Sequence, residues 1–186
     1  MKRALLTLML GLTACGPIDL EVVNVPDAGA FQPPVGASCA NTSECMAGQL
    51  CEKAACGDAL GRCVHRPPFC DGDSRPECGC DGVTYWNDCL RRSAGVEARE
   101  GRGPCVNPRP CDTTTPCPDG ALCGRLVFPN ECGRVAAGAC FVLPTTCLGQ
   151  MPDHFFACGA PMTQCFDACT AIRSGQPAAR FPGPCM

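Results

Sequence analysis

The sequence contains 21 cysteines, and their spacing repeats once along the chain. Intervals of five, five, six, ten and fifteen residues between cysteines occur in the same order in both halves. Each half holds ten cysteines, so we expect two tandem ten-cysteine modules, 39–105 and 111–185, joined by a linker at 106–110. The cysteines with matching intervals are Cys39, Cys45, Cys51, Cys63, Cys70, Cys78, Cys89 and Cys105 in the first half and Cys111, Cys117, Cys123, Cys140, Cys147, Cys158, Cys169 and Cys185 in the second.

Disulfides are expected to replace a conventional hydrophobic core. Leu, Ile, Val and Phe make up less than about a fifth of residues 15–186, the level below which a conventional core becomes doubtful. A cysteine content above about 8% in a short exported chain is typical of a disulfide scaffold. The two modules contain 20 of the 21 cysteines, which is an even number, and Cys15 lies outside them. The sequence therefore predicts that all the module cysteines are oxidised to disulfides.

The N-terminus has the features of an export signal. Two basic residues precede an apolar run, 4–12, that is too short to span a bilayer. The run ends in Leu-Thr-Ala-Cys at 12–15, which resembles the lipobox of bacterial lipoproteins. The resemblance implies that 1–14 is a signal peptide and that Cys15 becomes the first mature residue, with several acyl chains that form a durable membrane anchor. In bacterial lipoproteins an aspartate after the cysteine commonly holds the protein at the inner membrane, and here Gly16 stands at that position. The resemblance therefore implies a protein exported to the cell envelope and held at the outer membrane or the cell surface.

The segment 15–38 contains several prolines and glycines and shows no helical or strand period. This composition is typical of a flexible tether, which is its expected role. The short apolar stretch 20–25 leaves an alternative open, because it could form an edge strand docked on the modules.

The stretch 78–89 carries the most specific motif of the chain. It reads CGCDGVTYWNDC, and seven and ten residues separate Cys70, Cys78 and Cys89. This resembles the Kazal domain of serine protease inhibitors, which has the run C-G-x-D-G-x-T-Y-x-N-x-C and the same two spacings. The resemblance implies a Kazal-like domain at 63–105 and a degenerate second copy in the second module.

The motif residues also predict local structure. An Asp-Gly pair at 81–82 is typical of a tight hairpin turn, and an Asn-Asp pair at 87–88 can cap a short helix that ends at Gly95. Asp167 and Gly175 predict the same helix in the second module. The expected fold is small, disulfide-rich α+β. Each module would be a cysteine hairpin, similar to the one that precedes the Kazal unit in follistatin-like modules, followed by a Kazal-like hairpin plus a short helix.

The Kazal resemblance also implies disulfide partners. The family's fifth cysteine has no equivalent here, so we expect Cys80 to replace it, and Cys165, which lies opposite Tyr85 in the repeat, to do so in the second module. The hairpin cysteines are expected to pair crosswise. The resulting pairs are Cys70–Cys89, Cys78–Cys105, Cys63–Cys80, Cys39–Cys51 and Cys45–Cys56 in the first module, and Cys147–Cys169, Cys158–Cys185, Cys140–Cys165, Cys111–Cys123 and Cys117–Cys132 in the second.

Enzyme and metal chemistry are not expected. There is no Cys-x-x-Cys, and oxidised cysteines in an exported chain offer no thiolate to zinc. The acidic loop with Asp71, Asp73 and Glu77 lacks the later ligands of a calcium loop. His65 and His154 are the only histidines, and neither lies beside a nucleophile and an acid in a catalytic motif. The net charge of −3 disfavours a nucleic-acid partner, so we expect a non-enzymatic protein without cofactor or metal.

Two functions remain, and both need a protein partner. The Kazal resemblance implies an inhibitor whose exposed loop, 70–77, occupies a serine-protease cleft as a substrate that is cut slowly and resealed. Alternatively, the scaffold serves only for shape, as a non-inhibitory adhesion or interaction module on the envelope. The candidate reactive-site residues are Asp71, Gly72, Asp73 and Ser74, and the residues expected to support the loop are Tyr85 and Asn87.

Glycine at the reactive position bears on this choice. By family position the specificity residue is Gly72, and its counterpart in the second copy is Gly149. Glycine offers no side chain to a specificity pocket and loosens the loop, so we expect weak or absent inhibition. If the first module inhibits a protease, elastase-like or subtilisin-like enzymes fit better than trypsin-like ones. The second copy lacks the Tyr and Asn of the motif and has ten rather than seven residues between Cys147 and Cys158, so it is not expected to inhibit.

Overall fold

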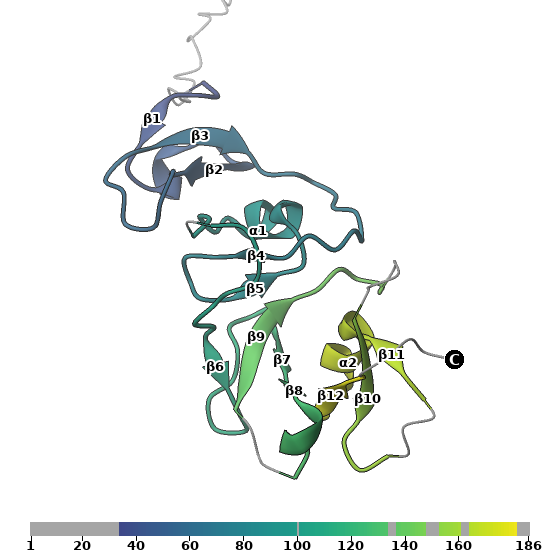
Figure 1. Ribbon diagram of the computed structural model, residues 1–186. Coiled ribbons are helices and arrows are strands. Elements are labelled where there is room, and N and C mark those ends of the chain that lie inside the picture. Colours follow the sequence, from purple (N-terminus) through teal and green to yellow (C-terminus); the bar gives the residue numbers. More distant parts are fainter. Residues whose placement is uncertain (1–33, 100, 134–136, 148–152, 161–163, 182–186) are drawn as a thin grey trace, which may run out of the picture. The chain divides into compact units, whose positions relative to one another are not determined.

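The computed structural model describes residues 34–99, 101–133, 137–147, 153–160 and 164–181. Within them the chain forms short strands, two 3₁₀ turns and two α-helices of seven residues each. Nine disulfides link pairs of these residues, and Cys165 is disulfide-bonded as well. The protein therefore has a small disulfide-rich α+β fold (Figure 1). The expected signal peptide, Cys15 and the stretch 20–25 lie outside the described residues.

The first cysteine hairpin is an antiparallel sheet in the order β1-β3-β2. Gly36 and Ala37 also bond to β3, since Gly36 N donates to Cys63 O and Cys63 N donates to Ala37 O, each at 2.8 Å. The end of the expected tether thus belongs to this sheet. The elements are β1 (Ser38–Cys39), the 3₁₀ turn η1 (Thr42–Glu44), β2 (Gln49–Glu52) and β3 (Gly61–His65).

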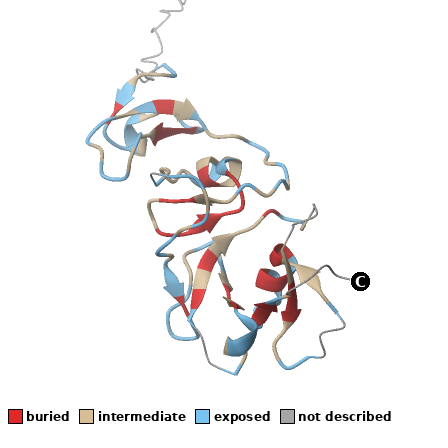
Figure 2. Ribbon diagram, in the orientation of Figure 1, coloured by how far each residue is buried: buried red, intermediate tan, exposed pale blue. Residues whose placement is uncertain are grey.

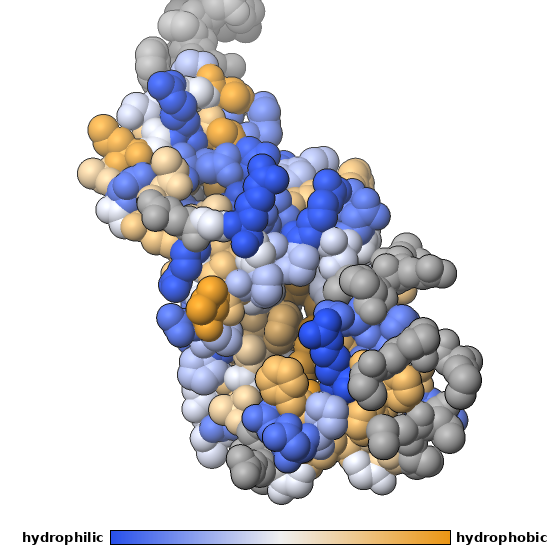
Figure 3. Space-filling model, viewed as in Figure 1, coloured by the Kyte–Doolittle hydropathy of each residue, from blue (hydrophilic) through white to orange (hydrophobic). Residues whose placement is uncertain are grey.

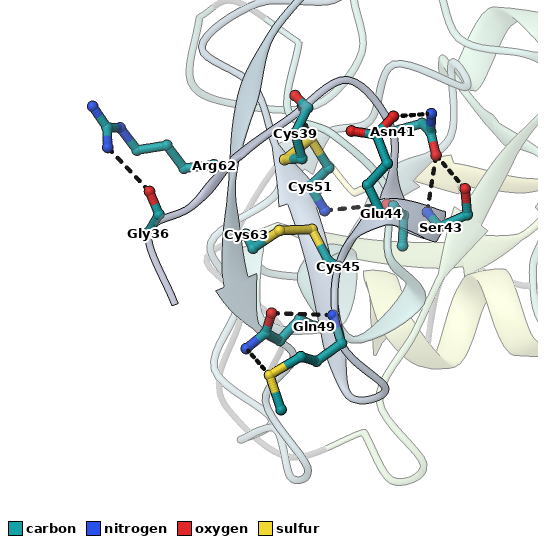
Figure 4. Close-up of a disulfide and its surroundings, with 12 residues drawn as sticks. Gly36, Cys39, Asn41, Ser43, Glu44, Cys45, Gln49, Cys51, Arg62 and Cys63 are labelled. Atoms are coloured by element: carbon teal, nitrogen blue, oxygen red, sulfur yellow. Dashed lines mark hydrogen bonds between the residues drawn. A yellow bond between two sulfur atoms is a disulfide. The ribbon is translucent and has the colours of Figure 1, made fainter. Parts of the chain in front are cut away.

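Two disulfides form the interior of this sheet (Figure 4). Cys51 in β2 lies directly opposite Cys63 in β3, but each bonds to a cysteine that precedes β2, giving Cys39–Cys51 and Cys45–Cys63. Three of these four cysteines are almost completely buried, and the cluster contains no other buried residue. In this cluster sulfur therefore takes the place of aliphatic side chains, and Leu50 of β2 is the fully buried aliphatic residue of the sheet outside it.

The expected pairs Cys63–Cys80 and Cys45–Cys56 are wrong. Cys63 lies within β3, so its side chain faces the hairpin interior and its partner comes from the hairpin. Cys56, in the loop between β2 and β3, bonds instead to Cys80, in the turn after β4 (Glu77–Cys78). That bridge ties the first sheet to the hairpin that follows it. Cys39–Cys51 has the expected partners.

The motif at 78–89 forms a hairpin and a helix. Gly82 has a φ of +78°, so the turn between the two strands needs glycine. Gly79 lies so close to Tyr85 that a β-carbon there would be 2.7 Å from the ring. The elements are β4 (Glu77–Cys78), β5 (Thr84–Tyr85) and α1 (Asp88–Ala94), and the disulfides Cys70–Cys89 and Cys78–Cys105 have the expected partners.

Helix α1 begins and ends as the sequence predicts. The side chain of Asn87 accepts a hydrogen bond from Leu90 N at 2.9 Å, and Gly95 ends the helix in the left-handed region with a φ of +75°. Arg91 is only 1% exposed and forms ion pairs with Asp88 and, at 2.9 Å, with Glu52 of β2. The buried cation thereby joins the helix to the first sheet.

The second half repeats the cysteine hairpin. Strands β7 and β9 are antiparallel and place Cys123 opposite Cys140, as β2 and β3 place Cys51 opposite Cys63. A second sheet, in the order β11-β10-β12-β8, packs with helix α2, which Asp167 caps and Gly175 ends with a φ of +66°. The elements are β6 (Pro110–Cys111), β7 (Leu122–Gly124), β8 (Leu126–Val127), the 3₁₀ turn η2 (Pro129–Glu131), β9 (Gly138–Val142), β10 (His154–Ala157), β11 (Phe166–Asp167), α2 (Ala168–Ser174) and β12 (Ala178–Arg180).

In the second half, as in the first, the cysteine in the last strand of the hairpin bonds to a cysteine earlier in the same hairpin. Cys140 lies in β9, so it bonds within its hairpin, to Cys117, and the expected pairs Cys140–Cys165 and Cys117–Cys132 are wrong. Cys132 bonds instead to Cys158, which excludes the expected Cys158–Cys185. The pairs Cys111–Cys123 and Cys147–Cys169 have the expected partners, and Cys185 lies outside the described residues.

The two halves share one sheet and two buried clusters, one around Trp86 and one around Tyr85. Strand β5 of the first half pairs in parallel with β9 of the second, in the order β4-β5-β9-β6. The linker contributes as well, because Arg109 N donates to Gly82 O at 2.7 Å and Pro110 pairs with Ala139. Buried residues lie in β5 and β9 and in β10, β12 and α2 (Figure 2). The halves are therefore continuous in structure, with no free linker between them.

Candidate functional site

The candidate loop, 70–77, is an irregular segment between the first sheet and β4. Its beginning is fixed by Cys70–Cys89, which ties it to α1, and its end by Cys78–Cys105. Between these anchors, Asp71 and Asp73 are exposed, whereas Gly72 and Ser74 are partly buried. The four candidate reactive-site residues thus lie together on one segment that is covalently held at both ends.

Asn87 connects this loop to helix α1. Its side chain is buried, with 3% of the residue exposed, and its oxygen caps the helix. Its amide nitrogen Nδ2 lies 3.1 Å from Asp71 O, 3.2 Å from Asp71 Oδ1 and 3.0 Å from Asp73 O, and donates toward them. One side chain therefore holds the carbonyl groups on both sides of Gly72, so Asn87 has the supporting role that the sequence suggested.

Trp86 holds the carbonyl group between those two. Its indole Nε1 donates to Gly72 O at 2.9 Å, and its own carbonyl oxygen accepts a hydrogen bond from Arg75 N, also at 2.9 Å. Three consecutive carbonyls, those of Asp71, Gly72 and Asp73, are thereby bonded to two neighbouring buried side chains. Trp86 was not predicted as a supporting residue, because no sequence pattern distinguishes a packed tryptophan from one that donates to a loop.

Charged groups add little to the support of the loop. Arg75 lies 3.6 Å from the carboxylates of both Asp71 and Asp73, but all three side chains are largely exposed. Exposed ion pairs of this kind contribute about 0–1 kcal/mol and weaken with salt. The hydrogen bonds from buried side chains therefore dominate the geometry of the loop.

Tyr85 supports the hairpin turn rather than the loop. Its hydroxyl donates to Asp81 Oδ2 at 2.9 Å, and the other oxygen of this carboxylate accepts from Val83 N. Burial, and secondarily the bond to Asp81, raises the pKa of Tyr85, so the hydroxyl stays protonated and remains a donor. The expected role of Tyr85 in supporting the loop is thus corrected, because its hydroxyl bonds to Asp81 in the turn of its own hairpin.

Phe69 is an unexpected feature beside the loop. It directly precedes Cys70 and is 90% exposed. Apolar and hydrophilic residues lie interspersed on the face of the molecule shown in Figure 3. A large apolar side chain next to a rigid loop is a contact that a protein partner can use. The other exposed large apolar residues among those described are Val35, Leu60, Val106, Leu122 and Phe128.

Three groups of side chains come close enough to suggest metal ligands. In two of them three cysteine sulfurs lie within 4.8 Å of one another, and the third combines two cysteines with Asp167. All of these cysteines are in disulfides, so they offer no thiolate to a metal. The groups are Cys39, Cys45 and Cys63; Cys111, Cys117 and Cys140; and Cys147, Asp167 and Cys169.

In the second copy of the loop, between Cys147 and Cys158, residues 148–152, which include Gly149, lie outside the described residues. No family model matches the sequence. In the part of the chain that the structure describes, no helix is both long and apolar enough to cross a membrane. The loop at 70–77 and the motif that supports it therefore remain the best-defined candidate site.

Proposed function

We propose that the protein is a serine protease inhibitor that acts through the loop at 70–77. The observation that carries this proposal is the bonding of the Asp71 and Asp73 carbonyls, on both sides of Gly72, to the buried side chain of Asn87. A segment that is ordered before it binds loses less conformational freedom in a protease cleft. It also resists the distortion that hydrolysis requires, so it occupies the cleft for longer than a flexible substrate.

The proposed target is a protease that tolerates a small residue in its primary pocket. Gly72 has no side chain to fill such a pocket, so the loop itself favours elastase-like or subtilisin-like enzymes. The exposed ring of Phe69 supplies apolar contact area three residues earlier in the chain. Affinity would then come from the backbone of the loop and from this ring.

A single substitution tests the inhibitory shape. Gly72→Lys adds a cation that can pair with the acid at the base of a trypsin-type pocket, and it leaves every disulfide in place. We expect the variant to inhibit trypsin at submicromolar concentration, roughly −8 kcal/mol of binding free energy or better. The measurement is residual trypsin activity against inhibitor concentration, with the unsubstituted protein tested against elastase and subtilisin in parallel.

The matched control is Val106→Lys, which places a lysine at a residue that is 93% exposed and outside the loop. It should not inhibit trypsin. If folded Gly72→Lys is digested as an ordinary substrate at the new lysine, the loop does not have an inhibitory shape. The non-inhibitory interaction module would then be the better proposal.

For localisation we propose that Cys15 is acylated and anchors the protein to the cell envelope. The lipobox-like sequence at 12–15 supports this, together with the even number of cysteines that remain. Cys15→Ala should move the protein from the membrane fraction to the soluble fraction of cells that express it, as seen by immunoblotting. A membrane fraction unchanged by the substitution would reject the acylation.

A further inference from the structure

Trp86 is the residue through which the second half of the protein reaches the candidate loop. On one side its indole nitrogen donates to Gly72 O. On the other, its backbone N–H donates to Val142 O in β9 at 2.9 Å, next to the pairing of Tyr85 with Val142. The residue thus bonds both to the loop of the first half and to a strand of the second.

The ring of Trp86 is buried among residues of the second half. It is 5% exposed and belongs to a cluster whose other buried members all follow residue 150. Ile172, which is 2% exposed, comes from α2 and is the largest aliphatic residue among them. The indole cannot turn away from Gly72 without disturbing this packing. The buried members of the cluster besides Trp86 are Phe155, Ala168, Cys169, Ala171, Ile172 and Ala178.

The bond from Trp86 also determines where the Gly72 carbonyl points. A serine protease hydrolyses a peptide bond only when its carbonyl oxygen enters the oxyanion hole, where backbone N–H groups stabilise the developing negative charge. The oxygen of Gly72 is instead bonded to an indole inside the protein. Hydrolysis of the bond from Gly72 to Asp73 must therefore first break this hydrogen bond.

We propose that Trp86 is a positioning residue through which the second half protects the bond between Gly72 and Asp73 from proteolysis. The second half then serves the loop of the first, which accounts for a tandem arrangement in which only the first copy keeps the complete motif. This inference rests on the proposed function in one respect, which is the choice of the loop at 70–77. Its test uses the free protein and does not require that any protease is inhibited.

The experiment compares Trp86→Phe with the unsubstituted full-length protein. Phenylalanine keeps an aromatic ring in the cluster but has no N–H to donate. A neutral hydrogen bond changes an equilibrium by a factor of about five to ten, so we expect cleavage at Gly72 to accelerate at least fivefold. A subtilisin-type protease is added, and mass spectrometry follows the gain of one water. The cut protein stays in one piece because Cys70–Cys89 and Cys56–Cys80 each join a residue before the cut to one after it.

A second pair of variants separates protection from general loss of stability. Ile172→Ala loosens the cluster around Trp86, whereas Val127→Ala loosens a separate cluster of the same half, which contains Phe156 and Ala179. We expect Ile172→Ala to accelerate cleavage at Gly72 and Val127→Ala to leave it unchanged.

Unchanged cleavage of Trp86→Phe would overturn the proposal, and so would equal acceleration by Ile172→Ala and Val127→Ala. If Trp86→Phe is cut faster although neither the unsubstituted protein nor Gly72→Lys inhibits any protease, the inference stands and the proposed function fails. If the protein inhibits a protease but Trp86→Phe is cut at an unchanged rate, the proposed function stands and the inference fails.

Discussion

Full reduction of the disulfides is expected to unfold the protein in native buffer. The first sheet shows the reason most clearly, because its buried cluster consists only of cysteines, among them Cys39, Cys51 and Cys63. In the chain-entropy model a disulfide that closes a loop of about 15 residues contributes roughly 3 kcal/mol. Loss of several such bridges exceeds the roughly 5–15 kcal/mol by which a typical domain is stable.

Circular dichroism before and after reduction measures the unfolding. Intact-mass measurement after alkylation under denaturing, non-reducing conditions provides the control, because the unreduced protein should take up no label at its module cysteines. Two or more labelled thiols per molecule, or a native spectrum that persists after reduction, would contradict the role assigned to the disulfides.

Asn87→Asp is expected to release the loop while it preserves helix α1. Aspartate caps a helix about as well as asparagine, so the bond from Leu90 N is retained. A carboxylate has no N–H to donate, however, and it faces the carbonyl oxygens of Asp71 and Asp73 that the amide now holds. Loss of these bonds at about 1 kcal/mol each, with repulsion between the oxygens added, predicts cleavage in the loop that is faster by about 100-fold.

The reciprocal exchange, Asp167→Asn, is the matched control. Asp167 caps α2 through a bond from Thr170 N at 2.8 Å, as Asn87 caps α1, and its second carboxylate oxygen accepts from the hydroxyl of the same threonine. Digestion by subtilisin and thermal unfolding are measured for both variants. Asp167→Asn should leave cleavage of the 70–77 loop unchanged. If Asn87→Asp also leaves it unchanged, the side chain of Asn87 does not hold the loop.

Local structure was the part that the sequence predicted well. Helix caps and turns depend on a few neighbouring residues, so Asn87, Gly95, Asp167 and Gly175 indicated both helices and their ends. The turn at Gly82 was predicted for the same reason, since few residues other than glycine adopt its φ of +78°. The small disulfide-rich α+β fold followed from the cysteine content and was confirmed.

Partners distant in the sequence were harder to predict. Cys63 was assigned to the hairpin that follows it, whereas strand pairing places it in the hairpin that precedes it, and this one error displaced Cys45, Cys56 and Cys80 as well. Cysteine spacing alone does not determine which sulfurs meet. The parallel pairing of β5 with β9 also has no local signal, and without it the contact of Trp86 with the second half could not be foreseen.

The pairing of β5 with β9 determines how the protein can be divided for study. A fragment that ends at Cys105 would lack β9, so Thr84 and Tyr85 would present an unsatisfied strand edge to solvent. The indole of Trp86 would be uncovered at the same place. An open edge beside an exposed aromatic ring is a template for self-association. Aggregation of the isolated first copy would therefore be a consequence of dividing the sheet, and shortened versions of this protein should keep β5 and β9 together.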